Sequence, residues 1–542
     1  MTNLNINEVG WKASSDEGVV AAGSAASVMA GVNILNEGGN AVDAAVATIF
    51  ALNVTDHGDC SIGGEVPIMI YDAKSQSVKV LSGQGRAPLS QEAIDWYLRN
   101  GIPGDGDIKM TPVPSVVDSC ITALRLFGTR TFEDVISSSI DLLDAGNEEW
   151  HPKLAHTFRR MVEEEHISKG VREQKLQSVT DRFYGRHESR KDIADELEAD
   201  YVSKGGFLRR NDLAAHFTTI EEPINVSYRG HSIYKCGPWT QGPFLCQALC
   251  LLSDFDLTSL GHLSVDYIHT IVEAIKLAMA DRDYYYGDPD FVNVPLDVLL
   301  SDEYNHMRSK LINKHKASMQ ARPGDPYNMQ PIKEISSFRP GVGGTTTCVV
   351  ADRWGNVVSA TPSANVPESP RDGGESGVTF SNRLRMFNTT PGHPNCIEVG
   401  KRPRSTLTPT IILKDEKPIM AISVAGGDLQ DQVALNLIVN AIDFNMLPDS
   451  CVTAPRFATT HHQDSFDPNP DREATFKNAG SVMLKEDFDN EIKEDLRRRG
   501  HTIQTTKSYI GRPVMLAIDQ EEGTIYAAGD PEGGRHAAAM GD

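Results

Sequence analysis

The chain has 542 residues, of which 40% are hydrophobic and 23% are charged. This composition is that of a globular protein with a sizeable core, and it excludes an intrinsically disordered chain. The formal net charge of −22 argues against nucleic acid and anionic membrane surfaces as partners, because both repel a strongly acidic protein.

The first residues and the cysteines favour a cytoplasmic location. Residues 1–18 contain no basic segment followed by an apolar one, so no secretory signal is expected. No apolar run approaches the roughly 18 residues that a membrane-spanning helix requires. The eight cysteines are scattered without C-x-x-C pairs, which is typical of reduced, buried thiols rather than of a disulfide framework.

Helical patterns dominate the first part of the chain. Four segments have a regular pattern: a helix pair at 24–54, hairpins at 67–81 and 224–236, and an amphipathic helix at 264–283. We expect Gly38-Gly39 to separate the first two helices and Ser264 to cap the last one. Residues 312–344 lose this periodicity and gather Lys, Pro and Gly, which predicts a linker.

Strands dominate the second part. The expected strands are 345–351, 356–361, 409–414, 418–424, 513–518 and 524–528. One helix, at about 429–442, lies among them. The sequence therefore predicts a helix-rich part, residues 1–344, followed by a strand-rich part, residues 345–542.

The junction between these parts reads GVGGTTTCVVADRWGNVVSATPSAN over residues 341–365. One interpretation is a β-hairpin with a loose entry. The other is self-cleavage, because a strained bond after a glycine pair is open to attack by the next hydroxyl. Scission between Gly344 and Thr345 would leave Thr345 with a free α-amine. With a pKa of about 8, this amine can act as the base for the hydroxyl of its own residue.

Further motifs occur in a consistent order along nearly the whole chain. They are EGGNAVDAAVA at 37–47, SGQGRAP at 82–88, TTTCVVADRWGNVVSATPS at 345–363, KRPRSTLTPTII at 401–412 and AGGDLQ at 425–430. Together they resemble the gamma-glutamyltranspeptidase family of N-terminal-nucleophile hydrolases. The resemblance implies an α+β fold, a four-layer αββα sandwich, made from a precursor that cleaves itself into a large chain, 1–344, and a small chain, 345–542. It allows a homodimer of the processed heterodimer.

The resemblance also implies catalytic roles. Thr345 matches the nucleophile, and Thr347 matches a second residue near the new amine. Ser363 matches a hydroxyl that hydrogen-bonds the nucleophile. Gly426 and Gly427 match the pair of backbone N–H groups that holds the oxyanion of the tetrahedral intermediate.

The implied substrate site is built for a carboxylate. Arg86 matches the arginine that binds the substrate α-carboxylate, with Ser405 and Thr406 as an assisting hydroxyl pair. Asn365 matches an amide in the same pocket. No metal or organic cofactor is implied. The adjacent histidines His461-His462 point to opposite faces of a strand, which disfavours joint ligation.

One departure from the family pattern concerns the α-amino group of a γ-glutamyl substrate. In SNRLRMF, residues 381–387, Met386 stands where the family has an acid, and Arg383 where it has glutamine. Met offers no counter-charge, and an arginine repels an ammonium group while attracting more carboxylate. This favours a carboxylated amide without an α-ammonium group, such as oxamate or a dicarboxylic monoamide, as in the oxamate amidohydrolase branch of the family.

Two alternatives stay open. The first is a true γ-glutamyl hydrolase or transpeptidase acting on glutathione or other γ-glutamyl amides. The second is a non-catalytic relative that folds without cleavage. The segment 389–400, TTPGHPNCIEVG, is shorter than the lid loop of many family members, which favours hydrolysis over transfer.

Overall fold

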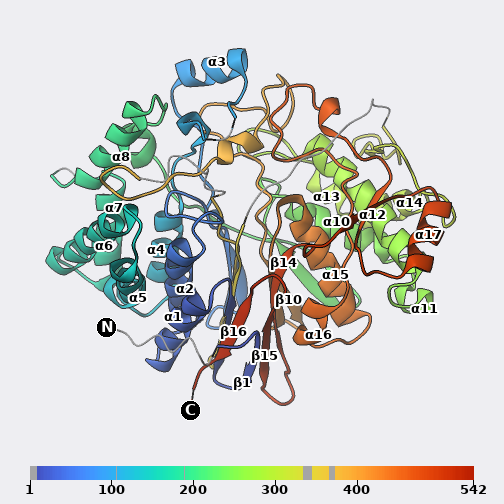
Figure 1. Cartoon of the computed structure of the whole chain (residues 1–542), viewed down its shortest axis with the longest axis horizontal. Coiled ribbons are helices and arrows are strands. Elements are labelled where there is room, and N and C mark those ends of the chain that lie inside the picture. Colours follow the sequence, from blue (N-terminus) through green and yellow to red (C-terminus); the bar gives the residue numbers. More distant parts are fainter. Residues whose placement is uncertain (1–8, 105, 188, 334–344, 365–372, 542) are drawn as a thin grey trace.

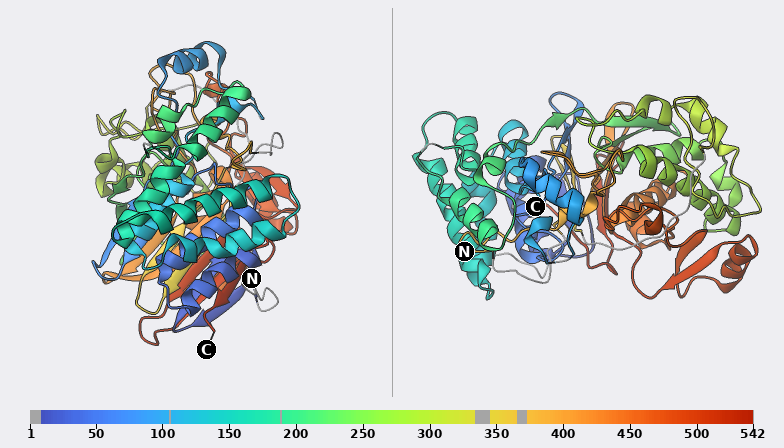
Figure 2. Two further views of the ribbon diagram at one scale, coloured as in Figure 1. Left: turned by 90° about the vertical axis from the view of Figure 1, so that its left-hand side faces the viewer. Right: turned by 90° about the horizontal axis from the view of Figure 1, so that it is seen from above.

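The computed structural model describes residues 9–104, 106–187, 189–333, 345–364 and 373–541. Two seven-stranded sheets lie face to face at its centre, and helices cover the outer face of each (Figures 1 and 2). All strand pairs within these two sheets are antiparallel. The predicted α+β fold with four layers in the order αββα is confirmed.

The two sheets mix strands from both parts of the chain. The first has the order β16 (His536–Ala539), β2 (Gly18–Ala22), β8 (Cys348–Asp352), β9 (Val357–Ala360), β3 (Ile68–Asp72), β4 (Ser77–Leu81) and β5 (Ile220–Glu221). The second has the order β1 (Lys12–Ser15), β15 (Ile525–Gly529), β14 (Arg512–Ile518), β11 (Lys417–Ala425), β10 (Thr410–Lys414), β7 (His231–Lys235) and β6 (Ile224–Tyr228). Residues 1–344 and 345–542 therefore do not fold as separate units.

Helices form the two outer layers. The layer beside the first sheet holds α1 (Ala25–Asn36), α2 (Ala41–Thr55), α4 (Val116–Phe127), α5 (Phe132–Ala145), α6 (Trp150–Ile167), α7 (Arg172–Phe183) and α8 (Asp192–Ser203). The layer beside the second sheet holds α10 (Gly242–Leu252), α12 (Val265–Tyr285), α14 (Asp302–Ser309), α15 (Gln430–Ile442) and α16 (Pro448–Thr453). The remaining elements are α3 (Gln91–Asn100), α9 (Arg210–Ala214), α11 (Leu257–Leu260), α13 (Leu296–Leu299), α17 (Asn490–Arg498) and the parallel pair β12 (Ser481–Lys485) and β13 (Thr502–Thr506).

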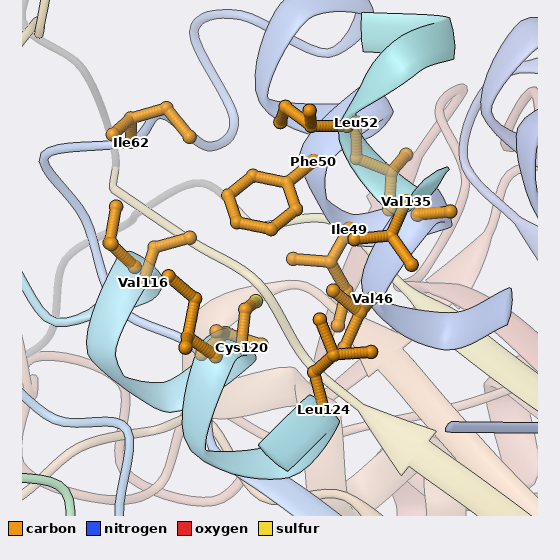
Figure 3. Close-up of a cluster of buried hydrophobic side chains, with 14 of the residues drawn as sticks. Val46, Ile49, Phe50, Leu52, Ile62, Val116, Cys120, Leu124 and Val135 are labelled. Atoms are coloured by element: carbon orange, nitrogen blue, oxygen red, sulfur yellow. The ribbon is translucent and has the colours of Figure 1, made fainter. Parts of the chain in front are cut away.

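The core fills the spaces between the layers. Along β8, Val349 packs between the two sheets while Val350 faces the helices, because successive side chains of a strand point to opposite faces. Figure 3 shows the helical side of this core, where Phe50 of α2 lies among side chains of α2, α4 and α5. Because β8 is buried on both faces, its sequence CVVAD does not alternate between apolar and polar residues.

Most predicted elements are confirmed, with two corrections. The segment 264–283 is a helix capped by Ser264, but almost all of α12 is buried, so it is not amphipathic. Its charged residues are buried because they pair with other charges, as Glu273 does with Lys276. The strand expected at 345–351 begins only at Cys348, so the three threonines precede it. Part of the predicted linker, 334–344, lies outside the described residues.

Among the described residues, the search for a helix that is long and apolar enough to cross a membrane finds none.

Candidate active site

The three threonines lie directly before β8, the third strand of the first sheet. Thr345, Thr346 and Thr347 are all fully buried. The Thr346 hydroxyl donates to Asp56 Oδ2 at 2.7 Å, which ties the segment to the end of α2. Gly344, the other half of the predicted scissile bond, lies outside the described residues, as does Asn365.

The Thr345 side chain contacts two residues from distant parts of the chain. Its Oγ lies 3.2 Å from Ser363 Oγ and 3.2 Å from the side-chain amide of Gln430. Its backbone carbonyl accepts from the Arg512 guanidinium at 2.7 Å, and Arg512 also pairs with Asp59 at 2.7 Å. The Thr345–Ser363 contact has the geometry that the predicted roles of these two residues require.

The neighbours of Gln430 determine the orientation of its amide. The carbonyl oxygens of Val424 and Thr406 lie 3.1 and 2.9 Å from one amide atom, and a carbonyl oxygen only accepts. That atom is therefore Nε2, and Oε1 faces the Thr345 hydroxyl at 3.2 Å. In this orientation the Thr345 hydroxyl can donate its proton to Gln430 Oε1, while the Ser363 hydroxyl lies within hydrogen-bond distance of both Thr345 Oγ and the Asp59 carbonyl oxygen.

Gln430 is expected to position the nucleophile. A glutamate at this position cannot donate to the two carbonyl groups, so Gln430→Glu should lower kcat about tenfold or more and change KM less. Gln432→Glu is the matched control, because Gln432 Nε2 also donates to two buried carbonyl groups, at 3.1 and 2.9 Å. Equal losses of kcat in the two variants, measured on folded protein, would contradict a positioning role.

The glycine pair lies close to this amide. Strand β11 ends at Ala425, and Gly426 and Gly427 follow with φ of +145° and +59°. Both values lie in the region that favours glycine, so the chain turns sharply into a 3₁₀ turn and then α15. A Cβ on Gly427 would lie 2.9 Å from the Phe466 ring.

The predicted hydroxyl pair lies beside the glycines. Gln241 Nε2 lies 3.3 Å from the carbonyl oxygens of both Thr406 and Gly427. Ser405 Oγ accepts from the backbone N–H of Leu407 at 3.1 Å. Thr406 Oγ1 is buried without a hydrogen-bond partner among the described residues, and so is Thr347 Oγ1. These two hydroxyl groups are therefore available to a bound molecule or to the new amine.

Arg86 lies on a loop against Asp288 and Asp290. Its Nη1 donates to the Gly400 carbonyl at 3.2 Å and lies 4.0 Å from Asp288 Oδ2. Its Nη2 lies 3.6 Å from Asp290 Oδ2. These separations exceed the 2.7–2.9 Å that is typical of a charge-assisted hydrogen bond. The side chain is 24% exposed. The described contacts do not join Arg86 directly to Thr345, so its predicted role stays a prediction.

Arg383 has an acidic partner that the sequence did not indicate. Its Nε lies 2.5 Å from Glu65, and both side chains are fully buried. Burial raises the pKa of Glu65 to about 7, with Arg383 acting in the opposite direction. The charge of Arg383 is therefore compensated inside the protein. Glu65 is also joined to the site by its backbone, which pairs with Ser363.

The site can be compared with known proteins. The model of the gamma-glutamyltranspeptidase family matches residues 27–179 and 148–540. The glutathione hydrolase proenzyme of Bacillus subtilis (strain 168) is 30% identical, with 97% of this chain and 91% of the relative covered. The acylase ACY 1 proenzyme of Pseudomonas sp. (strain SE83) is 28% identical, with 95% and 92% covered. The solved structure of LmbA2991HD superimposes with a TM-score of 0.85 at 31% identity, over 97% of this chain and 99% of the other.

The chain belongs to the gamma-glutamyltranspeptidase family. It is therefore a hydrolase of the N-terminal-nucleophile type, as the resemblance implied. Both curated relatives are proenzymes, which agrees with a precursor that is processed into a large and a small chain.

Three residues around Thr345 were missed by sequence reasoning. They are Gln430, Arg512 and Asp59. Gln430 lies three residues after Gly427, at the start of a helix. The residue type of a glutamine at this position does not by itself indicate a role at the site. Asp59 and Arg512 lie 453 positions apart and meet only in the folded chain. The two aspartates in the pattern DHGDC, directly after α2, were the only indication in the sequence that charged side chains gather at this turn.

Metal-ligating side chains gather elsewhere. Among the described residues one group, His269, Glu273 and His501, has ligand atoms within 4.8 Å of one another. The two rings are hydrogen-bonded to each other at 2.8 Å, and Glu273 accepts from Lys276. His461 accepts from the Gly480 N–H at 2.8 Å. These contacts satisfy the side chains without an ion.

Proposed function

We propose that this protein cleaves itself between Gly344 and Thr345 and then hydrolyses the amide of a small carboxylate-bearing substrate that has no α-ammonium group. Oxamate and short dicarboxylic monoamides are the substrate class. The homodimer and the cytoplasmic location stay predictions from the sequence.

The proposed reaction uses groups of this chain alone. Thr345 Oγ attacks the amide carbonyl carbon while the new α-amine takes the hydroxyl proton. The N–H groups of Gly426 and Gly427 hold the negative charge that develops on the carbonyl oxygen. The α-amine then gives its proton to the leaving ammonia or amine, and a threonyl ester remains. Water attacks this ester by the same route and releases the carboxylic acid.

The observation that carries the substrate proposal is the pairing of the acids around the site. Three carboxylates near the site each face an arginine: Asp59–Arg512 beside Thr345, Glu65–Arg383 beside Ser363, and Asp428–Arg282 beside the glycine pair. An ammonium group bound beside these three acids of the described part of the chain would lose its water without gaining an unpaired carboxylate from any of them. A carboxylate has Arg86, whose present acidic neighbours are held at longer distances.

A second candidate is hydrolysis or transfer of γ-glutamyl groups. It is favoured by the 30% identity with a protein named glutathione hydrolase proenzyme, whereas the acylase proenzyme at 28% identity favours acyl amides. These two identities are too close to decide between the candidates.

A matched pair of substrates separates them. Glutaryl p-nitroanilide and γ-glutamyl p-nitroanilide share the acyl length, the carboxylate and the leaving group, and they differ in the α-ammonium group. We expect kcat/KM to be at least about tenfold higher for the glutaryl compound, since an unpaired buried ammonium costs 1.4 kcal/mol or more. Faster release of p-nitroaniline from the γ-glutamyl compound would contradict the proposal and support the second candidate.

A further inference from the structure

One buried glutamine bridges two of the segments that form the site. Gln241 lies directly before α10, and its side chain is fully buried. Its Nε2 lies 3.3 Å from the carbonyl oxygen of Thr406 and 3.3 Å from that of Gly427. An amide nitrogen carries two hydrogens, so each carbonyl group can accept one of them. The side chain therefore connects the predicted hydroxyl pair with the glycine pair.

The orientation of this amide follows from a neighbour that can only donate. Nη1 of Arg282, on α12, donates to Gln241 Oε1 at 2.8 Å, and a guanidinium has no acceptor. The other amide atom is therefore the nitrogen, which faces the two carbonyl oxygens. Arg282 is itself held by an ion pair with Asp428 and by the Gln463 carbonyl at 3.0 Å. The Gln241 side chain is thus fixed on both sides of its amide.

The Thr406 carbonyl joins Gln241 to the nucleophile. In the orientation that its neighbours impose, Gln430 Nε2 donates to this same oxygen at 2.9 Å, while Oε1 faces the Thr345 hydroxyl at 3.2 Å. A carbonyl oxygen has two lone pairs and can accept from both amides. Gln241 therefore shares one acceptor with the side chain that positions the nucleophile.

Gln241 also ties the turn of the glycine pair to a firmly held segment. Its backbone N–H donates to the Ser405 carbonyl at 2.8 Å, and Thr240 pairs with Ser405 as an isolated parallel bridge. The Gly427 carbonyl accepts from the Gln430 N–H within its own turn, so Gln241 adds the contact from a neighbouring segment. Since glycine has wide conformational freedom, this contact restricts the Gly427 peptide groups.

We propose that Gln241 is a positioning residue, whose amide holds the Gly427 and Thr406 carbonyl groups where the oxyanion hole and Gln430 require them. This inference rests on the proposed reaction, in which Thr345 attacks and the Gly427 N–H holds the oxyanion. Donors that are fixed in advance stabilise the transition state without reorganisation. Removing the Gln241 donors should therefore lower kcat and leave KM nearly unchanged.

Two substitutions remove these donors in different ways. Gln241→Met keeps the volume and loses the whole amide, whereas Gln241→Glu keeps an acceptor for Arg282 and, when ionised, cannot donate. We expect each to lower kcat about tenfold or more and to change KM less than about threefold. The substrate is whichever of oxamate, glutaryl p-nitroanilide and γ-glutamyl p-nitroanilide the parent cleaves fastest, and kcat is referred to processed, folded protein.

Gln247→Met is the matched control. Gln247 is a fully buried glutamine of α10, and its Nε2 donates at 2.6 Å to Asp281, the residue before Arg282 on α12. This variant loses a buried amide at the same helix pair without a contact to the glycine pair. Its kcat should stay within about twofold of the parent's.

A double variant tests whether Gln241 acts through Gly427. Gly427→Ala already displaces the peptide that Gln241 holds, so adding Gln241→Met should lower kcat by less than the product of the two single effects. A full product would overturn the proposal, and so would equal falls in Gln241→Met and Gln247→Met.

The remaining outcomes separate this inference from the proposed function. Parent-like kcat in either Gln241 variant, with Gly427→Ala impaired, would overturn the role of Gln241 and leave the proposed reaction standing. A parent that cleaves none of the three compounds would overturn the proposed function and this inference with it.

Discussion

Thr345→Ala should leave one uncut chain of 542 residues with no amidase activity. The variant lacks the hydroxyl that attacks both its own peptide bond and the substrate, so the loss should be at least about a thousandfold. Denaturing electrophoresis reports the cleavage, and release of p-nitroaniline from the glutaryl compound reports the activity.

Thr345→Ser is the matched control for this loss. Serine keeps the hydroxyl and its contacts with Ser363 and Gln430, so the chain should still be cut, more slowly, and should keep measurable activity. If Thr345→Ala were processed at the parent's rate, the nucleophile would lie elsewhere in the chain. If the parent itself stayed intact after long incubation, the interpretation as a non-catalytic relative would hold.

Gly427→Ala should lower kcat about a hundredfold or more at nearly unchanged KM. The added Cβ would meet the buried Phe466 ring at 2.9 Å in a conformation that disfavours alanine, and we expect the peptide to shift and take its N–H away from the position of the oxyanion. Loss of one oxyanion donor costs about 10²–10³ in kcat. Steady-state kinetics on the processed protein measure the effect.

Gly523→Ala is the control for backbone strain. Gly523 lies in the turn between β14 and β15 with φ of +76°, and a Cβ there would meet nothing within 4 Å. Both substitutions put alanine in the left-handed region, which costs about 1–2 kcal/mol of stability. A similar fall in kcat for both variants would show that Gly427→Ala acts by general destabilisation. It would contradict the proposed role of the Gly427 N–H in holding the oxyanion.

Local patterns in the sequence were sufficient for most of the elements, whereas the order of the layers came from the resemblance to the family. The helix pair broken at Gly38-Gly39 and the hairpin of β3 and β4 depend on spacing that neighbouring residues determine. The strand after the threonines begins three residues later than predicted, because apolar strand propensity does not show where hydrogen bonding to β2 begins.

Contacts between distant segments could not be predicted in this way. Gln430 meets Thr345 across 85 residues, and Arg383, in the 3₁₀ turn Arg383–Met386, meets Glu65 across 318 residues. The sequence suggested an arginine that attracts a substrate carboxylate at position 383. The fold instead compensates that charge inside the protein, because a fully buried cation needs a carboxylate partner.

The most direct test of the whole account is the mass of the intact mature polypeptides, combined with N-terminal sequencing of the smaller one. The account predicts two chains, residues 1–344 and residues 345–542, with the second beginning Thr-Thr-Thr-Cys. Active protein without a chain that begins at Thr345 would contradict the proposed nucleophile.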